Sequence, residues 1–138
     1  MSNLILAVCA HDVAEVQRLL DSGVNINACD VNGTSAFATA ASLGHIDIMQ
    51  ILHTRGANIF LKDHLHGYNA LGLAIEARRN DVVAWLLQIG FDASITTYSG
   101  KTALTLAIRC RNTVAVDLIC DDYKRCFGSA SGAVVIPQ

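Results

Sequence analysis

Apolar residues recur along this chain at helical spacing, in short blocks that end at glycine. Two blocks show the pattern most clearly, each with apolar residues at i, i+3 and i+4: Ile48, Ile51 and Leu52 in one, and Val82, Trp85 and Leu86 in the other. Residues at this spacing share one face of a helix. The pattern predicts helices that begin near Asp47 and Asp81, with these six side chains facing a core.

The helical blocks belong to a unit that repeats every 33 or 34 residues. Three kinds of marker recur at this interval. They are the turn residues Gly33, Gly67 and Gly100, the helix-start residues Ser2, Ser35, Asn69 and Thr102, and the helix-end residues Gly23, Gly56 and Gly90. Self-similarity at this period indicates stacked units that share one continuous core.

Each unit encodes the same local structure. A Ser, Asn or Thr side chain accepts backbone N–H bonds and so starts a first helix. A small residue recurs at Ala40, Ala74 and Ala107, where it allows two helices to approach closely. A carboxylate at Asp47 or Asp81 favours the start of a second helix, and the following glycine ends that helix in the left-handed conformation.

Several segments match the consensus of a known repeat family. In the second unit they are Ser35-Ala36-Phe37, Ala40-Ala41, Gly44-His45, Asp47-Ile48 and Gly56-Ala57-Asn58, and in the fourth they are Gly100-Lys101-Thr102-Ala103-Leu104 and Leu106-Ala107. With these segments the chain resembles the ankyrin repeat family over about residues 2–123. The resemblance implies an all-α repeat solenoid: stacked helix-turn-helix units with β-hairpin fingers.

We expect one repeat domain over residues 1–127. Its repeats are expected at about 1–29, 30–62, 63–96 and 97–127. Cys126 and Phe127 are expected to prolong the last helix. Residues 128–138 form a tail whose apolar end either folds back over the last repeat or serves as a linear motif that a partner binds as an added strand. A third interpretation is that the tail is an expression remnant or a stub of a longer protein.

Two kinds of departure from the family pattern bear on the expected structure. Arg78 and Arg111 occupy the position of the usual inter-helix glycine. If the backbone there is left-handed, each costs about 1 kcal/mol. The finger between Gly56 and Gly67 is one residue longer than the others, so its tip, residues 63–66, is expected to protrude.

Composition and charge limit the classes of partner. The chain has 138 residues, 52% of them hydrophobic, and a formal net charge of −2, so no global field attracts nucleic acid or membrane. Residues 1–69 carry −3 and residues 70–138 carry +1. No run of eighteen apolar residues exists, and the N-terminal segment lacks the basic region of a signal peptide.

The cysteines point to a reducing compartment. They are Cys9, Cys29, Cys110, Cys120 and Cys126. Their odd number and the absence of a CxxC pair disfavour a disulfide framework or a zinc site. We therefore expect buried free thiols and a cytoplasmic protein, with the nucleus or a host cytosol as alternatives.

No catalytic signature occurs: the chain has no GxSxG, phosphate loop or HExxH. We expect no enzyme activity, no cofactor and no metal, because His64 and His66 are two potential ligands without a third. The resemblance implies structural roles for His45, whose ring bonds backbone in the family, and for Asp30 and Asp63, which bond the N–H groups of their turns.

The resemblance also implies that finger tips and first helices form a concave binding face. The predicted partner-binding residues are Val31, Asn32, Leu43, His64, Leu65, His66, Tyr68, Glu76, Tyr98, Lys101 and Arg109. Leu43, Leu65, Tyr68 and Tyr98 would provide apolar anchors. For the two tyrosines the alternative is packing between adjacent fingers.

Basic side chains form a second candidate surface. Arg78, Arg79, Arg109 and Arg111 fall at the ends of neighbouring first helices, with Lys101 farther along the groove. They either meet carboxylates on a partner or form a solvated basic rim.

The sequence thus predicts a monomeric, non-catalytic module that binds another protein, as an adaptor, scaffold or inhibitor, and binds neither nucleic acid nor membrane. The alternative is a structural fragment of a longer repeat array, or a unit that self-associates through its C-terminal tail.

Overall fold

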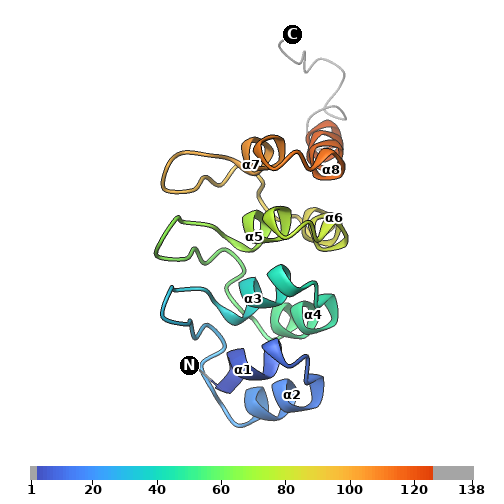
Figure 1. The fold of residues 1–138 in the computed structure, drawn as a ribbon. Coiled ribbons are helices and arrows are strands. Elements are labelled where there is room, and N and C mark those ends of the chain that lie inside the picture. Colours follow the sequence, from blue (N-terminus) through green and yellow to red (C-terminus); the bar gives the residue numbers. More distant parts are fainter. Residues whose placement is uncertain (1–2, 126–138) are drawn as a thin grey trace.

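The computed structural model describes residues 3–125, which form eight α-helices in four stacked pairs (Figure 1). The pairs, numbered here as repeats one to four, are α1 (Asn3–Cys9) with α2 (Val13–Asp21), α3 (Ala36–Leu43) with α4 (Ile46–Thr54), α5 (Ala70–Glu76) with α6 (Asn80–Gln88), and α7 (Ala103–Arg109) with α8 (Thr113–Tyr123). The expected stack of helix pairs is confirmed. Cys126, Phe127 and the tail 128–138 lie outside the described residues.

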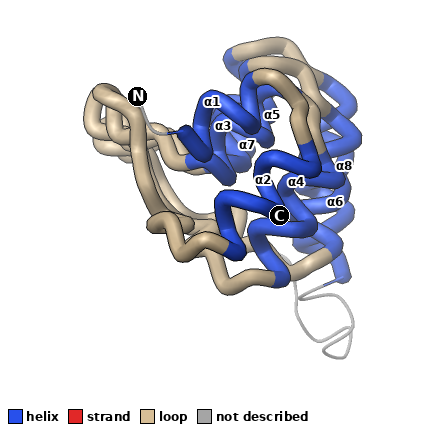
Figure 2. The backbone as a smooth tube through the Cα atoms, turned by 90° about the horizontal axis from the view of Figure 1, so that it is seen from below, coloured by secondary structure: helices blue, strands red, loops and turns tan. Residues whose placement is uncertain are grey.

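The helices form two layers, and the connecting loops project to one side. First helices α1, α3, α5 and α7 stack on each other, and the second helices lie beside them, on the side away from the finger loops (Figure 1). Seen along the stack, the finger loops project away from both layers (Figure 2). Side chains that recur once per repeat therefore come to lie above one another.

The caps predicted for the first helices are present. The side chains of Ser35, Asn69 and Thr102 accept N–H bonds from the residue three positions later, at 3.2, 3.0 and 3.3 Å. Ser2 lies outside the described residues. The helix-end glycines are left-handed as expected, for example Gly56 with φ 88°.

The inter-helix turn requires a left-handed residue in every repeat. Gly44 supplies it in the second repeat with φ 81°, and Arg78 and Arg111 supply it in the third and fourth with φ 59° and 55°. The strain expected at the two arginines is thus present. His11 has φ 54° at the same position in the first repeat, where no left-handed residue was predicted.

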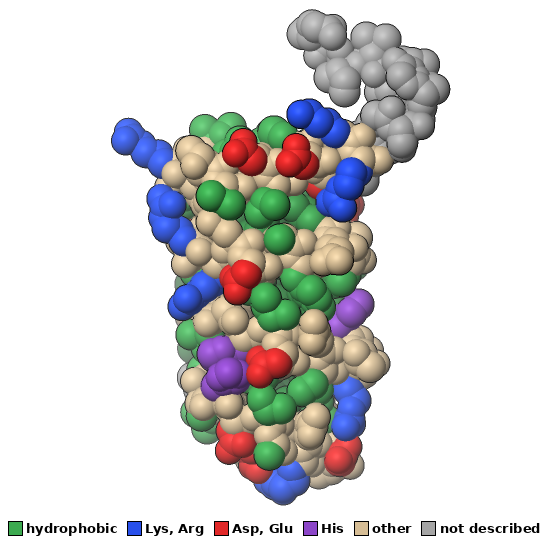
Figure 3. Space-filling view, turned by 90° about the vertical axis from the view of Figure 1, so that its right-hand side faces the viewer, with side chains coloured by type: hydrophobic (Ala, Val, Ile, Leu, Met, Phe, Trp, Pro, Cys, Tyr) green, Lys and Arg blue, Asp and Glu red, His purple; other side chains and the backbone are tan. Residues whose placement is uncertain are grey.

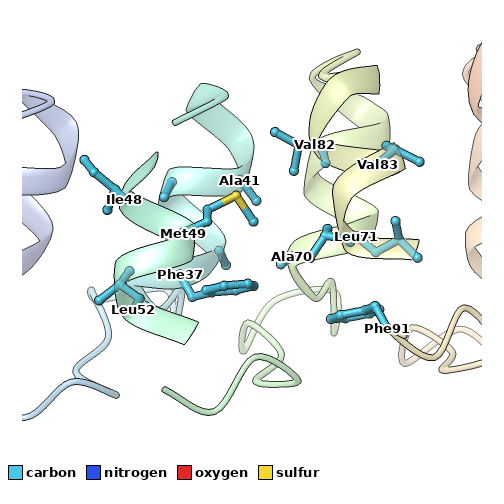
Figure 4. Close-up of a cluster of buried hydrophobic side chains, with 14 of the residues drawn as sticks. Phe37, Ala41, Ile48, Met49, Leu52, Ala70, Leu71, Val82, Val83 and Phe91 are labelled. Carbon is cyan, nitrogen blue, oxygen red and sulfur yellow. The ribbon is translucent and has the colours of Figure 1, made fainter. Parts of the chain in front are cut away.

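Buried hydrophobic side chains form one continuous core along the stack. Figure 4 shows its part in the second and third repeats, where Phe37 and Phe91 join the aliphatic side chains. Ile48, Leu52 and Leu86 are fully buried as predicted, but Ile51 and Trp85 are only partly buried. Met49, Val83 and Leu87 are buried in the same two helices. Each second helix packs on its own first helix and on adjacent repeats, so its buried stripe is shifted relative to the simple i, i+3, i+4 face.

The fingers are hairpin-shaped loops without paired strands. Each is closed by one backbone hydrogen bond at its base: Asp30 N to Thr34 O at 3.0 Å, Asp63 N to Tyr68 O at 3.0 Å, and Thr97 N to Lys101 O at 2.9 Å. Among the described residues, the single isolated β-bridge joins Cys29 and Ser35. A longer β-ladder does not form in these loops because the segments before the fingers bend at turns that a side chain closes. At one such turn Asn58 Oδ1 accepts the Phe60 N–H.

The prediction of buried thiols is wrong for two cysteines. Cys9 and Cys29 are exposed, whereas Cys110 and Cys120 are half-buried, and all four are free. Cys9 is the last residue of α1, on the side of the helix that faces solvent, and Cys29 lies in a finger loop.

Candidate functional site

Backbone hydrogen bonds join neighbouring fingers into one surface. His64 N donates to Asn32 O at 2.7 Å, and Tyr98 N donates to His66 O at 3.0 Å. The three finger tips, around residues 30–34, 63–68 and 97–101, are thereby fixed relative to each other. Side chains from different fingers can act together on one ligand.

Asp63 shapes the longer second finger. Its Oδ1 accepts hydrogen bonds from the N–H groups of Leu65, His66 and Gly67, at 3.1, 2.8 and 2.9 Å. The turn role expected for Asp63 is therefore confirmed, as it is for Asp30. This turn accommodates the one additional residue of the finger, and Leu65 remains 63% exposed at the tip.

An open groove of about 290 Å³ lies between the second and third fingers. Its lining contains five of the predicted binding residues together with Ser99: Leu65, His66, Tyr68, Tyr98 and Lys101. Apolar, aromatic and cationic groups thus meet in one place, which suits a peptide with a hydrophobic side chain.

Tyr98 both packs between fingers and faces solvent. Its ring lies against Gly67, where an added Cβ would come within 2.7 Å of Cδ1. The Nζ atom of Lys62 lies 5.9 Å from the ring centroid, a cation–π contact. The tyrosine nevertheless remains 62% exposed, so it is held in place while staying accessible in the lining of the groove.

Tyr68 links the groove to the helix ends. Its ring lies 5.5 Å from that of His66. Burial and a hydrogen bond to Glu76 raise the pKa of the Tyr68 hydroxyl, against the opposing charge of Arg109. Glu76 and Arg109, both predicted site residues, therefore border the inner end of the groove.

The other predicted residues lie outside this groove. Val31 is 92% exposed on the first finger with Asn32 beside it, and Leu43 is half-buried at the end of α3. His64 covers Gly33, where an added Cβ would lie 2.5 Å from its ring. Within residues 3–125 no cluster of three metal-ligating side chains is present.

Sequence reasoning missed the polar contacts between repeats. Asn112 is 1% exposed, and its side-chain amide donates to Ile75 O at 3.3 Å and to Asn80 Oδ1 at 2.8 Å. Its own Oδ1 accepts the Ala115 N–H at the start of α8. In the sequence, these contacts are indicated by a single feature, the asparagine that precedes the second helix of the fourth repeat.

The His45 ring does not make the backbone hydrogen bond that the family resemblance implied. It stacks on His11 with ring centroids 4.0 Å apart, and no hydrogen bond from its ring to backbone occurs within residues 3–125. Because His11 belongs to the preceding repeat, the contact joins two repeats.

A family model described as ankyrin repeats, in three copies, matches residues 4–97. The chain belongs to the ankyrin repeat family. Ankyrin repeats generally bind other proteins and are generally non-catalytic. Among the residues that the structure places, no helix is both long and apolar enough to cross a membrane.

The chain is similar to parts of several longer proteins. It is 28% identical over 151 aligned positions to a Dirofilaria immitis protein named L-asparaginase, covering 86% of this chain and 25% of that protein. It is 32% identical over 103 residues to Protein PhlB of Serratia liquefaciens, covering 75% and 45%. It is 29% identical over 94 residues to mouse Ankyrin repeat and SAM domain-containing protein 6, covering 67% and 11%. The chain thus spans less than half the length of these relatives.

Proposed function

We propose that this protein binds a segment of another protein in the groove between its second and third fingers, as an adaptor, scaffold or inhibitor in the cytoplasm. The observation that carries the proposal is the exposure of Leu65 and Tyr98 on rigidly turned fingers beside one groove. Side chains held in place before binding lose little entropy on association.

Other predicted residues would extend the contact. Val31 and Asn32 on the first finger, and Arg109 beyond Tyr68, lie on either side of the groove. A partner segment running across the fingers would bury the apolar tips and meet polar groups at both ends, which is the usual arrangement of a binding interface.

The test compares the affinity of a captured partner for two double variants. Leu65→Ala with Tyr98→Ala truncates the groove, and Leu6→Ala with Val114→Ala truncates apolar side chains that are about equally exposed elsewhere, at 50% and 51%. We expect Kd to rise about tenfold or more for the groove variant and to stay unchanged for the control. Equal affinities, with both proteins folded, would contradict the groove assignment.

A second candidate function is self-association through the outer face of the fourth repeat. Ile75 in α5 is fully buried, whereas Ile108 at the equivalent position of α7 is 59% exposed. Sedimentation of the full chain and of Ile108→Glu separates the candidates. A monomer in both cases excludes this alternative, and a wild-type dimer that the substitution dissociates supports it.

A further inference from the structure

Ion pairing divides the cations of this protein into two groups. Four of the ten Lys and Arg side chains pair with carboxylates, and all four lie in or directly after second helices: Arg18, Arg55, Lys124 and Arg125. Within residues 3–125 the other six form no ion pair, and they lie on the fingers or at the ends of first helices. These are Lys62, Arg78, Arg79, Lys101, Arg109 and Arg111. The cations on the second-helix side are therefore paired with carboxylates, and those on the finger and loop side are not.

Four of the unpaired cations form what we call the arginine edge: Arg78, Arg79, Arg109 and Arg111. All four are exposed and lie where α5 and α7 end and their inter-helix turns begin. Lys and Arg side chains follow one another from repeat to repeat along the left margin of the stack in Figure 3. Because adjacent repeats stack in register, the four guanidinium groups share one rim.

Two of these arginines are held in place by backbone carbonyls of neighbouring repeats. Arg78 Nη2 donates to Cys110 O at 2.6 Å in the fourth repeat, and Arg79 Nε donates to Ser42 O at 3.2 Å in the second. A guanidinium carries five N–H donors, so each group keeps donors for a ligand. Fixing the planar group in advance reduces the entropy lost when a carboxylate binds.

Carboxylates close to these arginines in sequence form no ion pair with them within the described residues. Glu76 bonds to Tyr68, Asp81 Oδ1 accepts the Val82 N–H at 2.9 Å, and Asp117 in α8 takes part in none of the ion pairs of residues 3–125. Ion pairs within the described residues therefore do not explain why arginine occupies these four positions. At Arg111 the left-handed backbone adds a cost, and its side chain makes no hydrogen bond or ion pair with another residue of the described chain.

We propose that the arginine edge binds an acidic segment of a partner protein, whose Asp or Glu carboxylates form paired hydrogen bonds with the guanidinium groups. The inference rests on the proposed function in taking the ligand to be a protein, and it adds a second surface with a defined charge. A nucleic acid fits less well, because the chain carries a formal net charge of −2 and the phosphates of a nucleic acid would be repelled by the molecule as a whole.

The test measures binding of a labelled oligoglutamate peptide to the full chain by fluorescence anisotropy at low ionic strength. The edge variant is Arg78→Gly with Arg111→Gly, which restores the residue that suits the left-handed turn and so protects folding. The matched control is Arg18→Gln with Arg55→Gln, which removes the same charge from paired arginines on the second-helix side. We expect Kd to rise about tenfold for the edge variant and to change less than twofold for the control.

Three results would overturn the proposal. They are no binding of oligoglutamate to the wild type, equal losses in both double variants, and tighter binding of a short DNA duplex than of oligoglutamate. The groove variant Leu65→Ala with Tyr98→Ala separates the two proposals. It should bind oligoglutamate normally. A fourth contradicting result is a loss of binding in this variant together with an unaffected edge variant, which would place the acidic ligand in the groove.

Discussion

The imidazole rings of His11 and His45 lie face to face across the junction of the first two repeats, with centroids 4.0 Å apart and planes 5° apart. His11 Nε2 also donates to Asp47 Oδ2 at 2.9 Å. Burial and the charges of His11 and Arg79 hold the pKa of His45 below its usual value, against the opposing attraction of Asp47. The junction therefore favours a neutral His45.

This lowered pKa predicts a loss of stability in mild acid. Below the ordinary histidine pKa of about 6.5, His45 binds a proton more readily in the unfolded chain than in the folded one. The unfolded state then holds more protons, so the free energy of unfolding falls as the pH drops through this range. Urea denaturation at a series of pH values, followed by the fluorescence of Trp85, measures the slope.

The variant His45→Asn should flatten that pH dependence. The control His66→Asn changes an exposed finger histidine and should leave the slope as in the wild type. If His45→Asn and wild type lose stability in parallel between neutral and mildly acidic pH, the junction is not the source of the acid sensitivity.

Arg111→Gly should stabilise the protein by about 0.5–1 kcal/mol. Glycine relieves the left-handed strain at φ 55°, which exceeds the additional backbone entropy that glycine loses on folding. Gly44→Ala makes the reverse change at φ 81° and should destabilise by about 1 kcal/mol or more. Opposite shifts of the urea midpoint are expected, and shifts of the same sign would contradict the explanation.

Asp63→Ala should destabilise the protein by about 2 kcal/mol and loosen the second finger. The substitution removes the acceptor of three N–H bonds from a side chain that is 7% exposed. Amide hydrogen exchange should accelerate at Leu65, His66 and Gly67. Asp92→Ala, at an exposed loop aspartate, should cost no more than about 0.5 kcal/mol and provides the control.

Asn112→Ala should weaken the attachment of the fourth repeat by about 2 kcal/mol. The Ile75 carbonyl and the Asn80 side chain would lose a buried donor, and α8 would lose its cap. The rate of amide hydrogen exchange should increase more in α7 and α8 than in the helices of the first two repeats. The exposed neighbouring variant Thr113→Ala should show neither effect, and uniform exchange along the Asn112→Ala chain would exclude a local role.

The sequence determined the features that depend on a few neighbouring residues. The period, the caps at Ser35, Asn69 and Thr102, and the left-handed backbone at Arg78 and Arg111 follow from backbone sterics and hydrogen bonds within one turn of chain. The turn of Asp63 belongs to the same class. These features recur in each repeat because the local requirement recurs.

Which side chains meet across repeats depends on how the repeats pack on one another. Residues about one period apart become neighbours through stacking, and the rotation of one repeat on the next selects the contacting pair. That rotation sets His11 against His45, brings Arg78 to the Cys110 carbonyl and lays Tyr98 over Gly67. It also leaves Ile51 and Trp85 at the margin of the core. No local rule fixes such contacts, because they result from the packing of the whole stack.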